Sequence, residues 1–177
     1  MFNNSGKTDS NVSSSRLLAK SLLAAAGLGA AILAWPNAAL ADSEGPFAGL
    51  TGNWKGVGKV VTENGKTERI SCRANYTVSP DGINLGQSLV CASDSYRFDI
   101  KTNIYTDGQA LRGTWAEATH NATGNLTGEV HPGLIESRVT APGFAANVSV
   151  KTIGQKQIVS INPETKDIAQ VNITMSR

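Results

Sequence analysis

The sequence predicts an all-β protein, an antiparallel up-and-down meander of about nine or ten strands closed into a small barrel. After Asn53, no stretch places apolar residues at i, i+3, i+4 and i+7 for long enough to form a helix. Instead, short segments rich in Val, Ile, Thr, Tyr and Phe alternate with clusters of Gly, Asn, Asp and Pro. The spacing of these clusters also sets apolar residues opposite one another across hairpins. A two-layer β-sandwich is the alternative.

The first 41 residues are typical of a cleaved signal peptide and are set aside from the fold. Arg16 and Lys20 precede an uncharged run, residues 21–35, which is short for a membrane span of about 20 residues. Small residues at positions 39 and 41 place cleavage after Ala41, with an uncleaved anchor as the alternative. We therefore expect a bacterial protein that is periplasmic or secreted, with no stable membrane anchor after cleavage.

Residues 42–50 are expected to form an N-terminal arm and residues 51–177 a single barrel domain. The whole chain has a net charge of +2, but residues 42–177 carry equal numbers of acidic and basic side chains, interspersed along the sequence. Nothing here resembles the basic stripe that binds a phosphate backbone. We expect no nucleic acid partner.

The first strand, near residues 53–62, carries tryptophan and glycine on one face. A two-residue turn at Asn64 and Gly65 would put Trp54 on the face that carries Arg69 and Arg73, which would bury guanidinium groups. A three-residue loop, 63–65, with glycine in the left-handed position avoids this. It pairs Trp54 with Ala74, Gly56 with Cys72 and Gly58 with Ile70. The two strand glycines then either let the strand bend sharply or leave space inside the barrel.

The second hairpin predicts a disulfide bond between Cys72 and Cys91. A turn at Asp81 and Gly82 sets these cysteines opposite each other, and an exported protein meets an oxidising compartment. The same register pairs Ala74 with Leu89 and Val78 with Leu85. A two-residue turn would make the cysteines a hydrogen-bonded pair, with Cα atoms ~5.5 Å apart rather than ~4.5 Å. A four-residue loop or a bulge near Gly86 would relieve this.

The strand near residues 95–105 alternates apolar and polar side chains and is therefore half buried. A following turn at Asp107 and Gly108 would pair Ile104 with Leu111 and Ile100 with Trp115. Short connections throughout predict that neighbours in sequence are neighbours in the sheet, and closure removes both sheet edges. The predicted strands lie near residues 53–62, 66–78, 83–93, 95–105, 109–117, 125–131, 134–141, 144–152, 156–162 and 167–176.

The opening pattern Leu50-x-Gly52-x-Trp54-x-Gly56-x-Gly58 resembles the first strand of lipocalin-like (calycin) barrels and, more closely, of nitrobindin-like barrels. The lipocalin-like resemblance implies an arginine near the C-terminus that stacks over the tryptophan, for which Arg177 and Arg138 are the candidates. The nitrobindin-like resemblance implies haem bound by a histidine close to the C-terminus. Residues 132–177 contain no histidine, so we expect no haem and no other cofactor.

Few residues suggest chemistry. His120 and His131 are the only histidines, and both are expected in solvent-facing turns. With both cysteines in a disulfide, too few ligands remain for a metal site, so we expect no metal. Glu117, which the predicted register sets opposite Phe98, and Glu136 could point inward, but a strand-end charge or a surface ion pair is the preferred interpretation. We therefore name no catalytic residue and predict that the protein is not an enzyme.

Three functions remain. In the first, the barrel is an exported binding protein that holds a small apolar or amphipathic molecule. The interior set for this function, which could also simply fill the core, is Trp54, Tyr76, Phe98, Ile100 and Trp115. In the second, the protein binds an exported protein, for example as a protease inhibitor acting through its N-terminal arm. The third is a barrel enzyme of unknown chemistry.

Overall fold

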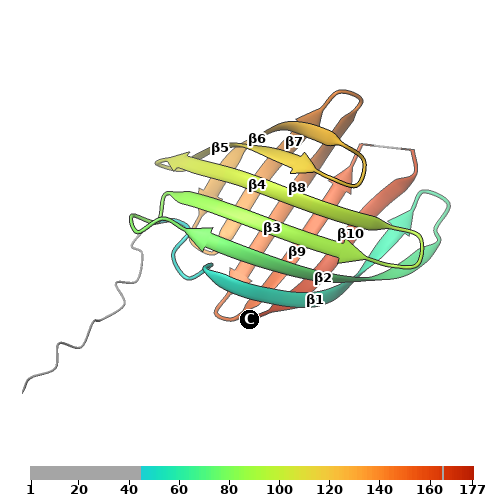
Figure 1. Ribbon diagram of the computed structural model, residues 1–177, viewed down its shortest axis with the longest axis horizontal. Helices are drawn as coiled ribbons and strands as arrows, with labels where there is room; N and C mark the ends of the chain where they lie inside the picture. The colour runs from blue at the N-terminus through green and yellow to red at the C-terminus, as the bar shows by residue number, and fades with distance from the viewer. Residues whose placement is uncertain (1–44, 165) are drawn as a thin grey trace, which may run out of the picture. The chain divides into compact units, whose positions relative to one another are not determined.

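The computed structural model describes residues 45–164 and 166–177, and within them ten antiparallel strands form a closed barrel (Figure 1). The predicted leader and its cleavage point lie outside the described residues. The strands are β1 (Gly52–Thr62), β2 (Thr67–Val78), β3 (Asn84–Ala92), β4 (Arg97–Asp107), β5 (Ala110–Glu117), β6 (Ala122–His131), β7 (Leu134–Ala141), β8 (Phe144–Ile153), β9 (Lys156–Pro163) and β10 (Ile168–Ser176).

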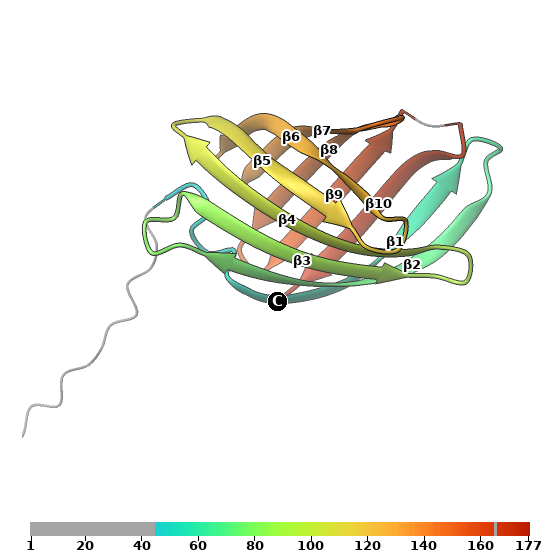
Figure 2. The same ribbon diagram turned by 45° about the horizontal axis from the view of Figure 1, so that its top comes forward.

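Closure of the sheet distinguishes the barrel from the sandwich. β1 pairs antiparallel with β10, for example Val60 with Val171, so no strand of the meander has a free edge. Figures 1 and 2 show β2, β3 and β4 running across one side while β8, β9 and β10 cross behind them at a steep angle. The predicted fold class, an all-β meander closed into a barrel, is therefore confirmed.

The first two hairpins have the predicted registers. Trp54 pairs with Ala74, and Gly65 closes the β1–β2 loop with a φ of 80°. In the β2–β3 hairpin, Cys72 pairs with Cys91 and the two form a disulfide bond. The Ser79 N–H donates to the Asn84 carbonyl (3.0 Å), which leaves a four-residue loop, 80–83. The Cα–Cα distance of the cysteines, 4.1 Å, fits the narrow pair that such a loop allows.

The predicted register of the β4–β5 hairpin is wrong by two residues. Ile104 pairs with Gly113 rather than Leu111, and Ile100 pairs with Glu117 rather than Trp115. The turn uses Gly108 and Gln109, with Gly108 at φ 60° in the first central position, where a type II′ turn requires a positive φ. Because a slip of two residues keeps every side chain on its face, the predicted interior face is unchanged. Glu117 therefore does not lie opposite Phe98.

The described part of the N-terminal arm seals one end of the barrel. Phe47 is fully buried and Leu50 is 5% exposed. The Phe47 N–H donates to the Gly82 carbonyl (3.1 Å), and the Trp54 indole N–H donates to the Leu50 carbonyl (2.9 Å). These bonds hold the arm across the end at which β1 begins. We call this end the floor of the barrel, and Figure 1 shows the arm beside the β2–β3 loop.

The glycines of β1 are required by the neighbouring strand. A Cβ atom on Gly56 would lie 2.0 Å from the carbonyl oxygen of Thr174, and one on Gly58 would lie 2.1 Å from that of Asn172. Both oxygens belong to β10. These glycines therefore allow close passage of the β10 backbone, which is neither of the two roles predicted for them.

Candidate functional site

The two ends of the barrel differ in how well their interior side chains are covered. Floor side chains are almost completely buried: Phe47, Leu50, Trp54, Tyr76, Leu111, Gln157 and Met175. At the opposite end, where β4 begins and β5 ends, several interior-facing side chains are only partly buried. We call this set the mouth, and it comprises Tyr96, Phe98, Ile100, Trp115 and Phe144. Solvent therefore reaches the interior aromatic side chains at this end, whereas the interior aromatic side chains of the floor are buried.

Aromatic rings of the mouth form two groups. Tyr96 and Phe98 stack with ring centroids 6.3 Å apart, and the His120 ring lies 6.1 Å from Phe98. Trp115 of β5 meets Phe144 of β8 edge to face, with centroids 5.8 Å apart. Partly exposed aromatic rings offer large apolar contact area to a planar or extended ligand. The mouth is thus the part of the interior best suited to bind a small molecule.

Trp115 has an indole N–H with no hydrogen-bond partner among the described residues, although the nitrogen atom is buried. A Cβ atom on Gly124 would lie 2.7 Å from this nitrogen, so glycine at that position lets the indole lie against β6. A buried donor without a partner costs roughly 1–3 kcal/mol.

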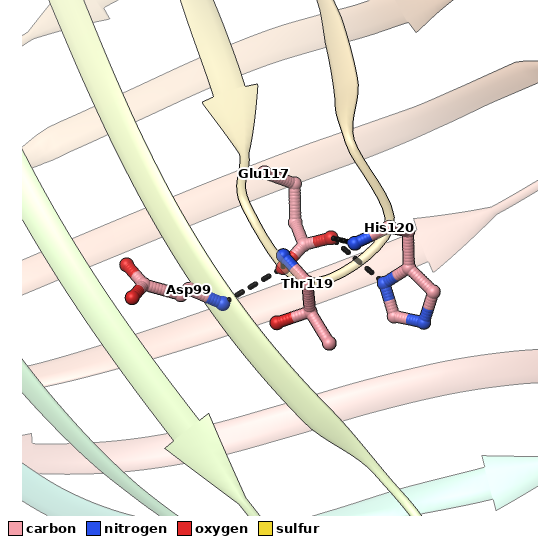
Figure 3. A network of polar contacts seen from close by, with 4 residues as sticks. All are labelled: Asp99, Glu117, Thr119 and His120. Atoms are coloured by element: carbon pink, nitrogen blue, oxygen red, sulfur yellow. Dashed lines mark hydrogen bonds and ion pairs between the residues drawn. The ribbon is translucent and has the colours of Figure 1, made fainter.

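Glu117 ends β5 with a buried carboxylate that holds the turn of residues 118–121 (Figure 3). It accepts hydrogen bonds from the backbone N–H groups of Asp99 (2.8 Å), Thr119 (3.0 Å) and His120 (2.7 Å). The His120 Nδ1 lies 2.7 Å from the same carboxylate. Burial raises the pKa of Glu117, but these donors outweigh it and lower the pKa to about 2.

The ionised state of Glu117 determines the tautomer of His120. A carboxylate only accepts hydrogen bonds, so the Nδ1 atom must carry the hydrogen of the Nδ1···Oε2 contact. In the neutral imidazole, Nε2 is then the acceptor. The His120 side chain is 63% exposed, so this second nitrogen stands at the solvent boundary beside Phe98.

The floor contains a polar network of a different kind. The buried Tyr76 hydroxyl donates to Gln157 Oε1 (3.0 Å) and accepts from Gln87 Nε2 (3.1 Å). Burial raises the pKa of Tyr76 to about 12, and the two amide contacts only partly oppose this. The Tyr76 hydroxyl is therefore neutral at physiological pH. Its hydrogen bonds stabilise the floor, and the hydroxyl is not a reactive group.

The predicted interior residues fall into two places. Trp54 and Tyr76 meet edge to face at the floor, with centroids 6.3 Å apart. Phe98, Ile100 and Trp115 belong to the mouth. Phe144 and the Glu117–His120 contact were not predicted as site features. The three-residue spacing of Glu117 and His120 across a tight turn is the signal that could have indicated that contact.

Other predicted candidates lie away from the mouth. His131 contacts Glu129 (3.4 Å), and Glu136 is exposed. Of the two arginine candidates, Arg177 lies over Trp54, with its guanidinium carbon 5.4 Å from the ring centroid. Arg138 forms a bidentate ion pair with Glu164.

A groove of about 810 Å³ crosses β4 to β7, but it lacks the character of a ligand pocket. Its lining is mainly exposed polar residues that share one register row on the outer face, and these are Asn103, Thr114, Asn125 and Thr140. Small-molecule sites are mostly apolar and bury most of the ligand. We therefore place the candidate site in the mouth.

Within residues 45–164 and 166–177, no group of three or more His, Cys, Asp or Glu side chains is arranged to hold a metal ion. In the same residues, no helix has the length and hydrophobicity needed to cross a membrane.

Comparison with known proteins gives a match in structure only. No family model matches the sequence, and no curated protein matches it. The structure is similar to that of the S-type phycobiliprotein lyase CPES from Guillardia theta, with a TM-score of 0.50 and 13% sequence identity. The match covers 72% of this chain and 87% of the lyase. The likeness is one of barrel fold alone, and the lipocalin-like and nitrobindin-like resemblances remain predictions.

This match overturns the prediction that the protein is not an enzyme. That prediction was drawn from the barrel architecture and from the lack of an evident nucleophile. A solved protein of similar fold is a phycobiliprotein lyase, so the architecture gives no argument against catalytic activity.

Proposed function

We propose that the protein is an exported barrel that binds a small apolar or amphipathic molecule through its mouth. One observation carries the proposal: the aromatic side chains Phe98, Trp115 and Phe144 face the interior yet are partly exposed at one end, while Phe47 and Trp54 seal the other. Apolar surface left accessible inside a barrel gains free energy when a ligand covers it.

In this proposal Phe98, Ile100 and Trp115 contact the ligand through their partly exposed apolar side chains. Trp54 and Tyr76 form the floor beneath. Their indole and hydroxyl hydrogen bonds are already made within the protein, so they have no donor left for a ligand.

The structural neighbour supports this type of function without defining the ligand. It is a phycobiliprotein lyase, and phycobiliproteins carry bilins, so a bilin is a sensible member of any ligand screen. Binding through the mouth is compatible with chemistry on the bound molecule. Export is supported by the disulfide bond between Cys72 and Cys91, which persists in oxidising compartments.

The alternative of a protease inhibitor acting through its N-terminal arm is less well supported. Phe47 and Leu50, the large apolar residues of the arm, are buried against the floor. Because they pack against the floor, these two side chains are not exposed for contact with a protease.

Fluorescence titration with 1-methoxypyrene, a neutral apolar probe, tests the proposal. We expect saturable binding that weakens about tenfold or more in a Trp115→Ala variant, because the indole supplies a large share of the apolar contact. A Tyr105→Ala variant, which removes an aromatic ring 50% exposed outside the mouth, is the matched control and should bind as the unaltered protein does. Absence of binding, or equal loss in both variants, would overturn the proposal.

A further inference from the structure

Within the proposed function, we propose that the Glu117–His120 pair selects ligands that carry an O–H or N–H donor, with His120 Nε2 as the accepting atom. The inference rests on the proposal that the mouth binds a small apolar or amphipathic molecule. It adds the chemical class of the ligand's polar group, such as a phenol, an enol, an alcohol or a pyrrole N–H.

The first step is the orientation of the imidazole. Two contacts tie His120 to one carboxylate oxygen, its backbone N–H and its Nδ1, each at 2.7 Å from Glu117 Oε2. A ring held through Nδ1 has a defined direction for Nε2. The exposed His120 is therefore far more ordered than an ordinary surface histidine.

The second step is the chemical state of Nε2. Because Glu117 is a carboxylate, Nδ1 is the hydrogen-bearing atom and Nε2 presents a lone pair in neutral imidazole. The arrangement is that of a histidine oriented by a carboxylate, which serves general bases in other proteins.

The third step is location. The His120 ring lies 6.1 Å from Phe98, which stacks on Tyr96, so the acceptor stands beside apolar rings of the mouth. A ligand whose apolar body covers Phe98 would bring its polar group to His120. Trp115 lies two residues before Glu117 on the same strand, β5, and adds a further partly exposed ring. The mouth therefore places one acceptor beside an apolar surface.

Glu117 also stabilises the backbone of the turn, and for this reason the test substitutes His120 rather than Glu117. Its carboxylate accepts three backbone hydrogen bonds, so removing it would alter the turn as well as His120. His120 is largely exposed, and its replacement leaves those backbone bonds in place. His120→Phe keeps an aromatic ring beside Phe98 and removes the acceptor.

The experiment compares 1-hydroxypyrene with 1-methoxypyrene, which share an apolar body and differ in one donor. At about pH 8, where histidine is ordinarily neutral, we expect the unaltered protein to bind the hydroxyl probe roughly three- to tenfold more tightly. His120→Phe should bring this ratio to about one. His131→Phe, which removes the only other histidine, should leave the ratio unchanged.

A second measurement reads the tautomer directly. ¹⁵N NMR of the imidazole, assigned with the His131→Phe variant, should show the Nδ1–H form in the free protein and a shift of Nε2 with 1-hydroxypyrene alone. The Nε2–H form, or equal affinity for both probes, would overturn the inference and leave the binding function standing. If neither probe binds, the proposed function fails and this inference fails with it.

Discussion

Arg177 lies over the indole ring of Trp54, with its guanidinium carbon 5.4 Å from the ring centroid. The same side chain donates from Nη1 to the carbonyl oxygens of Gly49 (3.0 Å) and Thr51 (2.8 Å). The last residue of the chain is thereby joined to the segment that enters β1. The Trp54 indole N–H also donates to the Leu50 carbonyl. The contact of Arg177 with Trp54 therefore helps to hold the N-terminal arm against the floor.

We predict that Arg177→Ala destabilises the protein by about 1–2 kcal/mol, since it removes a cation–π contact and two charge-assisted hydrogen bonds. Urea unfolding monitored by tryptophan fluorescence measures the change. Arg112→Ala, at an exposed position of β5, is the control and should stay within about 0.5 kcal/mol of the unaltered protein. Equal effects of the two substitutions would contradict the assigned role.

Reduction of the Cys72–Cys91 disulfide should destabilise the barrel by about 3 kcal/mol, because the bond closes a loop of 19 residues in sequence separation and restricts the unfolded chain. Thermal unfolding with and without a reductant measures this. The double variant Cys72→Ala, Cys91→Ala should be insensitive to reductant. An unchanged melting temperature of the unaltered protein after verified reduction would argue against the prediction.

Gly56→Ala should destabilise the protein by at least about 2 kcal/mol, because the added methyl group would meet the Thr174 carbonyl oxygen and push β1 away from β10. Lys59→Ala, an exposed change on the same strand, is the matched control. The free energies of unfolding of the two variants, measured by chemical denaturation, test this prediction. A Gly56→Ala protein as stable as the control would mean that β10 moves aside at little cost.

The stability of the protein should fall between about pH 4.5 and pH 2, in part through Glu117. Its pKa is lowered from 4.5 to about 2, so its contribution is present above pH 4.5 and is lost as the pH falls through the folded-state pKa. The loss attributable to this group is up to about 3 kcal/mol. Glu117→Gln removes the titrating carboxylate, so its stability should decline less steeply over this range. Parallel curves for the two proteins would contradict the assignment.

Local sequence was enough to predict the registers of the first two hairpins. The three-residue loop ending at Gly65 followed from keeping Arg69 and Arg73 out of the core, and the pairing of Cys72 with Cys91 followed from the turn near Gly82. The β4–β5 hairpin was predicted with the correct face but the wrong register. Alternation repeats every two residues, so it cannot detect a slip of two, and only the pairing of Asp107 with Ala110 in the folded chain decides it.

The candidate site was only partly accessible to sequence reasoning. Phe98, Ile100 and Trp115 were predicted to face inward because alternation assigns faces. The same rule placed Trp54 and Tyr76 beside them without distinguishing floor from mouth. That distinction depends on which end the arm covers, and the arm docks through the contact of Phe47 with the Gly82 carbonyl, between segments distant in sequence.

The sequence by itself therefore determined the strands, the registers of the first two hairpins, the disulfide bond and the inward faces, because alternation, turn chemistry and hairpin pairing act between nearby residues. Tertiary structure alone decided that β1 meets β10, that Arg177 rather than Arg138 covers Trp54, and that one end is sealed while the other leaves aromatic rings accessible. Each of these depends on closure of the sheet. Closure joins the two ends of the chain, and no local pattern encodes which residues meet there.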